Sequence, residues 1–237
     1  MEVRSVLTAA VLSLICLWFS DRRRRYKRSS YYRITRNAYE LTMKDKGRFG
    51  EYQIFKKLAF YEQGGARFLF NCYLPREDGG TTEIDVLMIH HSGIYVFESK
   101  NYSGRICGRE TDQNWTQLLK KKTSFLNPLR QNRSHVIRVR KLMGLGKETP
   151  VYSLVVFSDR CVLEKMAVKD PDCQVTNWKG LRRAVRRFAK RQPGTLEKRD
   201  VERLYQSLYP YTRVSRKEKR EHIRNIHRRW GKRSIFW

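Results

Sequence analysis

The sequence has few cysteines, and none of the five belongs to a C-x-x-C pair: they are Cys16, Cys72, Cys107, Cys161 and Cys173. An odd number of widely spaced cysteines argues against a disulfide framework, and the lack of close pairs argues against a zinc knuckle. We therefore expect reduced, mostly buried thiols in a cytosolic compartment.

Acidic residues are also scarce. The chain has 23 Asp and Glu against 51 Lys and Arg, a formal net charge of +28. A positive field of this size attracts polyanions, either nucleic acid or an anionic membrane leaflet, without distinguishing the two. Hydrophobic residues make up 40% of the 237 residues, too many for a disordered chain and enough for one domain with appendages. Because acidic residues are so few, any carboxylate that lies on an apolar face of that domain needs an explanation.

Long apolar runs are missing as well. Val6–Phe19 has fourteen residues without a charge, and extending it to residues 3–20, with Arg4 reaching the interface, brings it close to membrane-spanning length. We expect a single-pass transmembrane anchor over residues 3–20, the alternatives being a degenerate signal peptide and a peripheral helix. A basic run follows at once, so the positive-inside rule places the soluble part of the chain in the cytoplasm.

The basic run begins with four arginines that suit the anionic lipids of a cytoplasmic leaflet: Arg22, Arg23, Arg24 and Arg25. Residues 21–45 as a whole are basic, rich in tyrosine and aperiodic. We interpret this segment as a basic linker.

A helix is predicted over Lys46–Tyr61, where apolar side chains such as Ile54 and Leu58 repeat at helical spacing. Glu51 precedes these two by three and seven residues, so it belongs to the inward face, where an unpaired carboxylate is costly. Gly50 beside it lowers helix propensity and indicates close packing against another element.

Strand-like runs follow at Ala66–Leu74, Glu83–Ile89 and Gly93–Lys100. If the turn between the last two is centred between residues 91 and 92, residues whose numbers sum to 183 face each other. Asp85 then lies opposite Glu98, and Lys100 shares their face because it is two residues further along the strand. The register therefore brings three charged groups together.

Both faces of this hairpin are otherwise apolar, which predicts helices on both sides of the sheet and hence an α/β fold. Asn127-Pro128 has the pattern of an N-cap followed by proline, and it predicts a helix to about Met143. Further strands are expected at Val151–Ser158 and Cys173–Thr176, with a covering helix at Leu181–Phe188.

Two opposed carboxylates repel each other unless a cation lies between them, so Asp85 and Glu98 predict a site for Mg2+ or Mn2+. Such an ion supplies a hydroxide near neutral pH and a counter-charge for phosphodiester hydrolysis. Lys100 could orient the attacking water or neutralise charge in the transition state. The alternative is a buried structural cluster in which Glu83 pairs with Lys100.

Several motifs agree in order and spacing with a known family: Gly47-x-x-Gly50-Glu51, Thr82-Glu83-Ile84-Asp85, Glu98-Ser99-Lys100, Trp115 and Asn127-Pro128-Leu129-x-Gln131-Asn132. Over residues 44 to 160 the chain resembles the nuclease-related domain (NERD) family, which is grouped with the PD-(D/E)xK restriction-endonuclease-like nucleases. The resemblance implies a restriction-endonuclease-like α/β/α sandwich with a mixed central sheet, for which we expect residues 46–190.

The same resemblance implies roles for five residues. Asp85 and Glu98 would be the metal ligands, Lys100 the catalytic lysine, Glu51 an assisting acid from the first helix, and Gln131 an accessory polar residue. Ser99 stands where many members have an apolar residue. It points to the opposite face, so we expect it to affect packing and not chemistry. His135 is one turn beyond Gln131, so it could approach the site, but we interpret it as a surface histidine.

Residues 191–237 are expected to form a basic helical tail, in which Ser215 and Glu218 fit a capping box. Arg224, Arg228 and Arg229 would bind the phosphates of nucleic acid or anionic lipid. The alternative is a solvated basic tail without a partner.

The sequence thus predicts a membrane-anchored, cytoplasmic, metal-dependent nuclease of the NERD family that acts on DNA or RNA. The competing interpretation is a non-catalytic module on the same fold that binds nucleic acid or anionic lipid.

Overall fold

The computed structural model describes residues 2–164, 166 and 168–230. In the two terminal helices it describes the backbone but not the side chains of residues 2–6, 8–10, 216, 226, 227, 229 and 230.

The centre of the molecule is a five-stranded mixed sheet in the order β1-β2-β3-β7-β9. Its strands are β1 (Arg67–Pro75), β2 (Thr81–His90), β3 (Gly93–Lys100), β7 (Val151–Phe157) and β9 (Cys173–Asn177). Strands β1, β2 and β3 pair antiparallel, whereas β3, β7 and β9 pair parallel. The predicted strands are therefore all present, and the sheet is mixed, as predicted.

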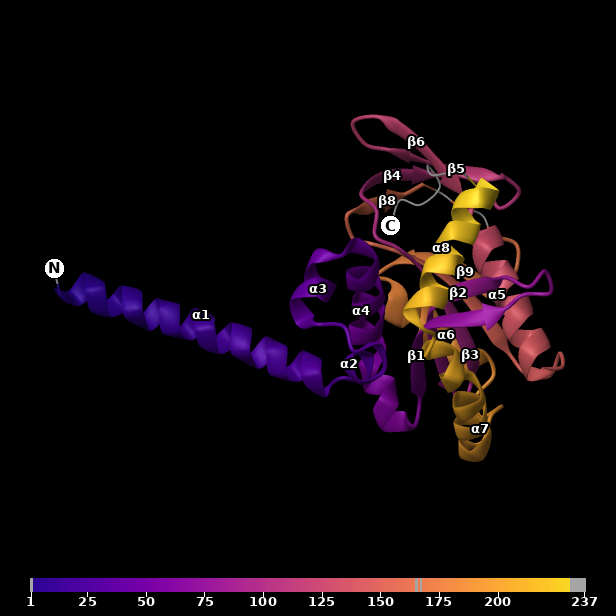
Figure 1. Cartoon of the computed structure of the whole chain (residues 1–237), viewed down its shortest axis with the longest axis horizontal. Coiled ribbons are helices and arrows are strands. Elements are labelled where there is room, and N and C mark those ends of the chain that lie inside the picture. Colours follow the sequence, from indigo (N-terminus) through magenta and orange to yellow (C-terminus); the bar gives the residue numbers. More distant parts are fainter. Residues whose placement is uncertain (1, 165, 167, 231–237) are drawn as a thin grey trace.

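Helices cover both faces of this sheet (Figure 1). On one face, α4 (Lys46–Leu58) and α6 (Leu181–Arg191) pack over an aromatic-rich core that includes Phe68, Phe70 and Phe97. On the other face, α5 (Pro128–Met143) and α7 (Lys198–Leu208) pack over an aliphatic core that includes Leu87 and Val96. Side chains alternate along each strand and therefore pack into two separate cores, one on each face of the sheet. Helices on both faces of a mixed sheet confirm the predicted α/β class.

The segment predicted as a linker is helical, and this prediction was wrong. Helix α1 (Glu2–Arg28) runs through its first part, followed by α2 (Ser30–Thr35) and α3 (Tyr39–Lys44). Tyr26 and Tyr31 are fully buried against the aromatic core. Tyr26 also hydrogen-bonds Thr42 and the carbonyl of Asn37. The sequence did not reveal these contacts, because the segment contains four arginines and its apolar residues are irregularly spaced. The tyrosines are buried by tertiary packing and do not repeat along one helical stripe.

The N-terminal part of α1 projects from the rest of the molecule (Figure 1). Their described apolar side chains are exposed, among them Leu12, Leu14, Leu17 and Trp18. Among residues with described side chains, no helix is long and apolar enough to cross a membrane. The transmembrane anchor predicted over residues 3–20 is therefore not supported, and most side chains of its N-terminal half lie outside the described residues.

A second, four-stranded sheet was not predicted. It has the order β6-β5-β4-β8 and consists of β4 (Gly104–Cys107), β5 (Asn114–Leu118), β6 (Lys122–Leu126) and β8 (Cys161–Leu163). Trp115 is fully buried in a small core under this sheet and donates its indole N–H to the carbonyl of Arg109 at 2.9 Å. These strands have only three to five residues each, so their alternation was too weak to reveal them.

The chain ends, within the described residues, in η2 (Tyr209–Thr212) and the basic helix α8 (Arg216–Trp230). The predicted capping box is present: the Glu218 amide donates to Ser215 Oγ at 3.2 Å, and the Ser215 amide donates to Glu218 Oε2 at 2.6 Å. Among its described side chains only His222 is buried. Its Nδ1 lies 2.8 Å from Thr81 Oγ1, so α8 rests against the start of β2.

Candidate active site

The register between β2 and β3 is the predicted one. His90 pairs with Gly93, and the ladder continues to the pair of Val86 with Phe97. It ends one step before Asp85 and Glu98 would pair, and there the Asp85 carboxylate accepts the backbone N–H of Ser99 at 2.8 Å. The two strands thus diverge where their carboxylates begin.

Glu98 is the most buried of these charged residues, with 1% of its surface exposed. Lys100 Nζ lies 2.7 Å from Glu98 Oε1, and His135 Nε2 lies 3.3 Å from Glu98 Oε2. Burial by itself would raise the pKa of Glu98, but the positive charge of Lys100 and the contact with His135 hold the pKa below its ordinary value. In turn Glu98 raises the pKa of Lys100 despite burial, so both groups are charged near neutral pH.

Asp85 lies in a different electrostatic environment. It is 7% exposed, and burial together with the neighbouring charges of Glu98 and Glu51 raises its pKa well above the ordinary value. Mutual repulsion of buried carboxylates thus disfavours full ionisation in the absence of a cation.

Helix α4 supplies Glu51 from the opposite side of the sheet's end. Gly50 makes this possible, because a Cβ at that position would lie 2.4 Å from Ser99 Oγ of β3. Tyr31 donates its hydroxyl to Glu51 Oε2 at 3.2 Å. Burial, with the nearby charge of Glu83, raises the pKa of Glu51 to about 7. Gly50 and Ser99, both of which were expected to affect packing, therefore lie against each other.

Helix α5 brings Gln131 to the same place. Asn127 caps the helix by accepting the Leu129 amide at 2.9 Å, and Pro128 occupies its first turn, as predicted. One turn later, Gln131 Oε1 accepts a hydrogen bond from Lys100 Nζ at 3.3 Å. Glu51, Asp85, Glu98, Lys100 and Gln131 therefore form one group.

His135 was wrongly interpreted as a surface residue. It is 3% exposed, and its Nδ1 lies 3.1 Å from Thr82 Oγ1 while Nε2 faces Glu98. Its spacing of four residues from Gln131 on one helix was a usable signal, because such residues share a helix face. Glu83 does not make the pair with Lys100 that the structural alternative required: Lys100 contacts Glu98, and the Glu83 carboxylate lies 3.8 Å from Nε2 of His222 in α8.

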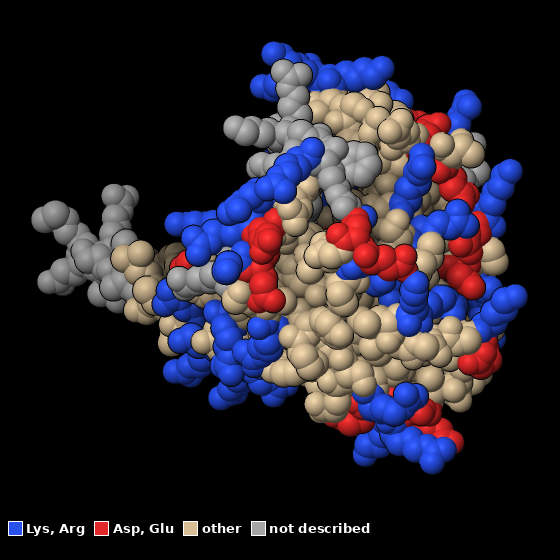
Figure 2. Space-filling model, turned by 45° about the vertical axis from the view of Figure 1, so that its right-hand side comes forward, with Lys and Arg blue, Asp and Glu red and all other residues tan. Residues whose placement is uncertain are grey.

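The arginines predicted to bind polyanions lie elsewhere. Arg22 stacks over Trp18 in α1, Arg23 and Arg25 pair with Glu40 and Asp21, and Arg24 is exposed. In α8, Arg224 and Arg228 are exposed, and the side chain of Arg229 lies outside the described residues. Figure 2 shows Lys and Arg spread over most of one face, with Asp and Glu in smaller groups. These arginines contribute positive charge to the surface and are not part of the candidate active site.

The chemistry of these carboxylates suits a hard divalent cation, but the present arrangement of the side chains does not. Carboxylate oxygens are the preferred ligands of Mg2+ and Mn2+, and Glu98 Oε2 is a buried oxygen without a hydrogen-bond donor among the described residues. Within the same residues, no group of three or more His, Cys, Asp or Glu side chains is arranged to hold an ion. Binding of an ion by Asp85 and Glu98 would therefore need a different arrangement of these side chains.

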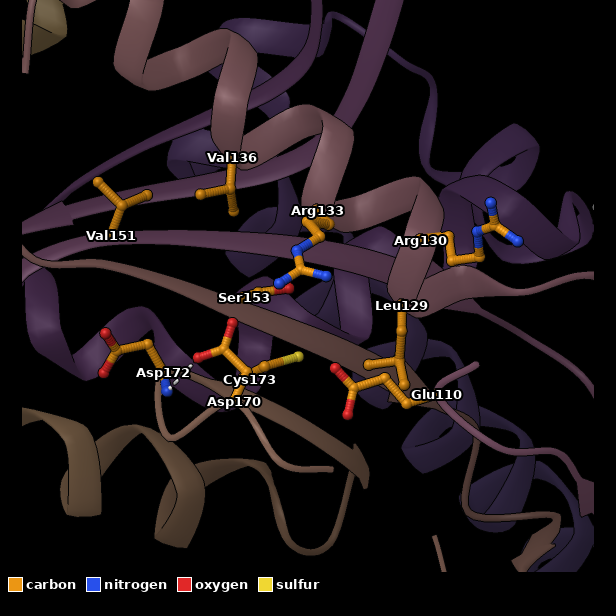
Figure 3. A pocket seen from close by; sticks show the side chains of 10 residues that line it. All are labelled: Glu110, Leu129, Arg130, Arg133, Val136, Val151, Ser153, Asp170, Asp172 and Cys173. Carbon is orange, nitrogen blue, oxygen red and sulfur yellow. Dashed lines mark hydrogen bonds between the residues drawn. The ribbon is translucent and has the colours of Figure 1, made fainter. Parts of the chain in front are cut away.

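A separate pocket of about 70 Å³ lies between α5, β7 and the segment before β9 (Figure 3). Arg133 projects into it opposite Asp170 and Cys173. It has room for a few water molecules only, and none of the five predicted site residues lines it.

Residues 46–158 match the profile of the nuclease-related domain (NERD), so this part of the chain belongs to that family. Membership indicates a nuclease-related function and interaction with nucleic acid. An uncharacterized protein of Bacillus anthracis is 28% identical over 188 residues, which cover 79% of this chain and 86% of that protein. The crystal structure of a protein of unknown function, AF1548, aligns over 74% of this chain and 95% of its own, with 14% identity and a TM-score of 0.31.

Proposed function

We propose that this chain is a divalent-metal-dependent phosphodiester hydrolase acting on nucleic acid, on a restriction-endonuclease-like fold. The observation that carries the proposal is the convergence of Asp85, Glu98 and Lys100 in a nearly closed site, within a domain of the NERD family. A buried carboxylate pair with a buried lysine is costly to maintain, and such groups concentrate where chemistry needs them.

Asp85 and Glu98 would hold Mg2+ or Mn2+. When bound, the ion would lower the pKa of a coordinated water and offset charge on the phosphate. Lys100 would donate to the phosphate oxygens or hold the attacking water, and Gln131 would orient Lys100 by accepting a hydrogen bond from its ammonium group. Glu51, with a pKa of about 7, could accept a proton from water near neutral pH.

The test is cleavage of DNA and RNA by the full-length chain with Mg2+ or Mn2+. Asp85→Ala, Glu98→Ala and Lys100→Ala should each lower the rate by about a hundredfold or more. Glu148→Ala, which removes an exposed carboxylate outside the group, is the matched control and should cleave normally. The proposal is lost if the intact protein binds nucleic acid but cuts no substrate with either metal.

The second candidate is a non-catalytic module that binds nucleic acid or anionic lipid. The observation in its favour is that Glu98 is already neutralised by Lys100 and approached by His135. In that case Lys100→Ala should lower the melting temperature and leave salt-sensitive binding of nucleic acid unchanged.

We also propose that the N-terminal helix attaches the protein to the cytoplasmic face of a membrane, which rests on the sequence of residues 3–25. Exposed Leu14, Leu17 and Trp18, followed by basic residues, support this proposal. The test is flotation with vesicles containing anionic lipid, comparing the full chain with one lacking residues 1–20. The deletion ends there because Tyr26 belongs to the core. Equal flotation of both chains would refute the proposal.

A further inference from the structure

Helix α8 lies beside the candidate active site, held by the buried side chain of His222. The Nδ1 atom of this histidine is 2.8 Å from Thr81 Oγ1 in β2, and its ring meets the Tyr73 ring of β1 edge-on, with ring centres 5.2 Å apart. Its Nε2 atom lies 3.8 Å from Glu83 Oε2, and Glu83 is two residues from Asp85 along β2. Figure 1 shows α8 crossing the sheet at β2.

The capping box of α8 fixes where the helix begins and therefore which side chains share a face. The Glu218 carboxylate accepts the Ser215 amide at 2.6 Å, so this acid is engaged at the helix start. Lys219 lies on the same side of the helix as His222, three residues further on. Its Nζ atom is 5.6 Å from the centre of the Tyr73 ring. This side of α8 therefore faces β1 and β2.

The opposite side of α8 carries a row of exposed basic side chains, which we call the α8 stripe: Lys217, Arg220, Arg224 and Arg228. Their spacings of three and four residues place them on one helix face, turned away from His222. The exposed acid Glu221 lies at one edge of the stripe and the exposed Ile223 at the other. From residue 217 to residue 228 the stripe rises about 16 Å, at about 1.5 Å per residue.

The form of the α8 stripe fits a row of phosphates. About 16 Å is the axial length of about five phosphates on one strand of a nucleic acid duplex. A helix that lies in a membrane interface instead buries an apolar face among the lipids. Among the described side chains of α8, Ile223 is the only large apolar one that is exposed, and the stripe itself is wholly basic. These features favour nucleic acid over a lipid surface.

We infer that the α8 stripe binds the sugar–phosphate backbone of nucleic acid on either side of the bond to be cleaved, and that His222 anchors the helix where this binding serves the site. A helix with its side chains is about 10 Å across, so the outward stripe contacts phosphates other than the one held at Asp85 and Glu98. The inference deepens the proposed function and rests on it for any effect on cleavage, whereas the binding needs no turnover.

The test removes three charges of the stripe from the full-length chain by Lys217→Gln, Arg224→Gln and Arg228→Gln. Glutamine keeps a high helix propensity, and the side chains are exposed, so the melting temperature should not change. Binding to a labelled DNA duplex and to a labelled RNA is measured in EDTA at several salt concentrations. The slope of log K against log salt should become shallower by about 2–3, because each lost phosphate contact removes about 0.9. The affinity should fall by about tenfold or more at about 0.1 M salt.

The matched control removes the same charge from α6 by Arg183→Gln, Arg186→Gln and Lys190→Gln. These side chains are also exposed, and α6 packs at the β9 edge of the sheet, whereas α8 docks at β1 and β2. The control should keep the wild-type slope to within about one. Equal losses in both triple variants, or wild-type binding by the stripe variant, would overturn the inference. Weaker flotation of the stripe variant with anionic vesicles, at unchanged binding of nucleic acid, would assign the stripe to lipid and overturn it as well.

The binding measurement also separates this inference from the proposed function. If the wild-type chain cleaves no substrate, the proposed function fails, and binding in EDTA still decides the role of the stripe. If the chain cleaves, the stripe variant should raise KM and leave kcat nearly unchanged, because contacts to flanking phosphates are the same in the ground state and the transition state. A lower kcat at unchanged KM would contradict a flanking role.

Discussion

Glu51→Gln should stabilise the protein at high pH when no divalent cation is present. Glu51 is 7% exposed, and its pKa in the folded chain is raised from 4.5 to about 7. Ionising Glu51 therefore costs more free energy in the folded state than in the unfolded state, and this difference destabilises the fold. The shift of 7 − 4.5 = 2.5 units corresponds to about 3 kcal/mol above pH 7.

The sign of the pH dependence follows from the raised pKa. Below pH 4.5 both states of the wild type carry a protonated Glu51, so the variant should gain little. The gain should grow as pH rises from 4.5 to 7 and level off above it, since wild-type stability is lost through this window. Gln keeps an acceptor for the Tyr31 hydroxyl, so the substitution removes charge with little loss of packing.

Urea unfolding at pH 4, 6 and 8 measures this difference, and a thermal scan should show a melting temperature higher by about 6–12 °C at pH 8. Added Mg2+ should reduce the gain, because a cation held by Asp85 and Glu98 would stabilise the ionised form of Glu51. A gain of equal size at all three pH values, or a loss at pH 8, would show that the electrostatic account of Glu51 is wrong.

Three further substitutions test the packing around the site. Gly50→Ala should lower the free energy of unfolding by about 1–3 kcal/mol and weaken activity, because the added Cβ would meet Ser99 Oγ. Ser99→Ala in the same chain should restore part of both losses. Additive effects of the two substitutions in urea unfolding would contradict a direct contact. His135→Ala should cost about 1–3 kcal/mol, because it removes a buried ring together with the hydrogen bond between its Nδ1 and Thr82 Oγ1. Denaturant midpoints will measure this loss, and an unchanged midpoint would contradict it. Asn132→Ala should cost a similar amount, because its amide donates to the Val96 carbonyl at 2.9 Å inside the core; faster amide exchange in β3 would report the loss, and unchanged protection would argue against it.

The sequence predicted the hairpin of β2 and β3 closely. The short turn centred between residues 91 and 92 was enough to define the register, because the length of a hairpin loop sets which residues of its two strands face each other. Helix α5 was equally clear, since Asn127 and Pro128 fix its start by capping chemistry that acts over two or three residues. Signals of this kind are local, so no tertiary information was needed.

The burial of Tyr26 and Tyr31 depended on tertiary structure. The same is true of the short strands β4, β5, β6 and β8. The tyrosines lie in a basic segment without an apolar stripe, and the strands gain their stability from pairing with one another and from the core around Trp115. Neither feature leaves a periodic pattern in the sequence. The tyrosines are buried by distant elements, such as Phe70 of β1 beside Tyr31, and the strands have only three to five residues each.

For the site, the sequence determined which residues are present and which strand faces carry them: Asp85, Glu98 and Lys100 follow from alternation and register. Tertiary structure decided what surrounds them. It brought His135 against Glu98 and gave Asn71 a left-handed backbone opposite Asp85. The physical reason is that side-chain direction along a strand is set by covalent geometry, whereas burial, repulsion and neighbouring charge depend on elements that meet only in the folded chain.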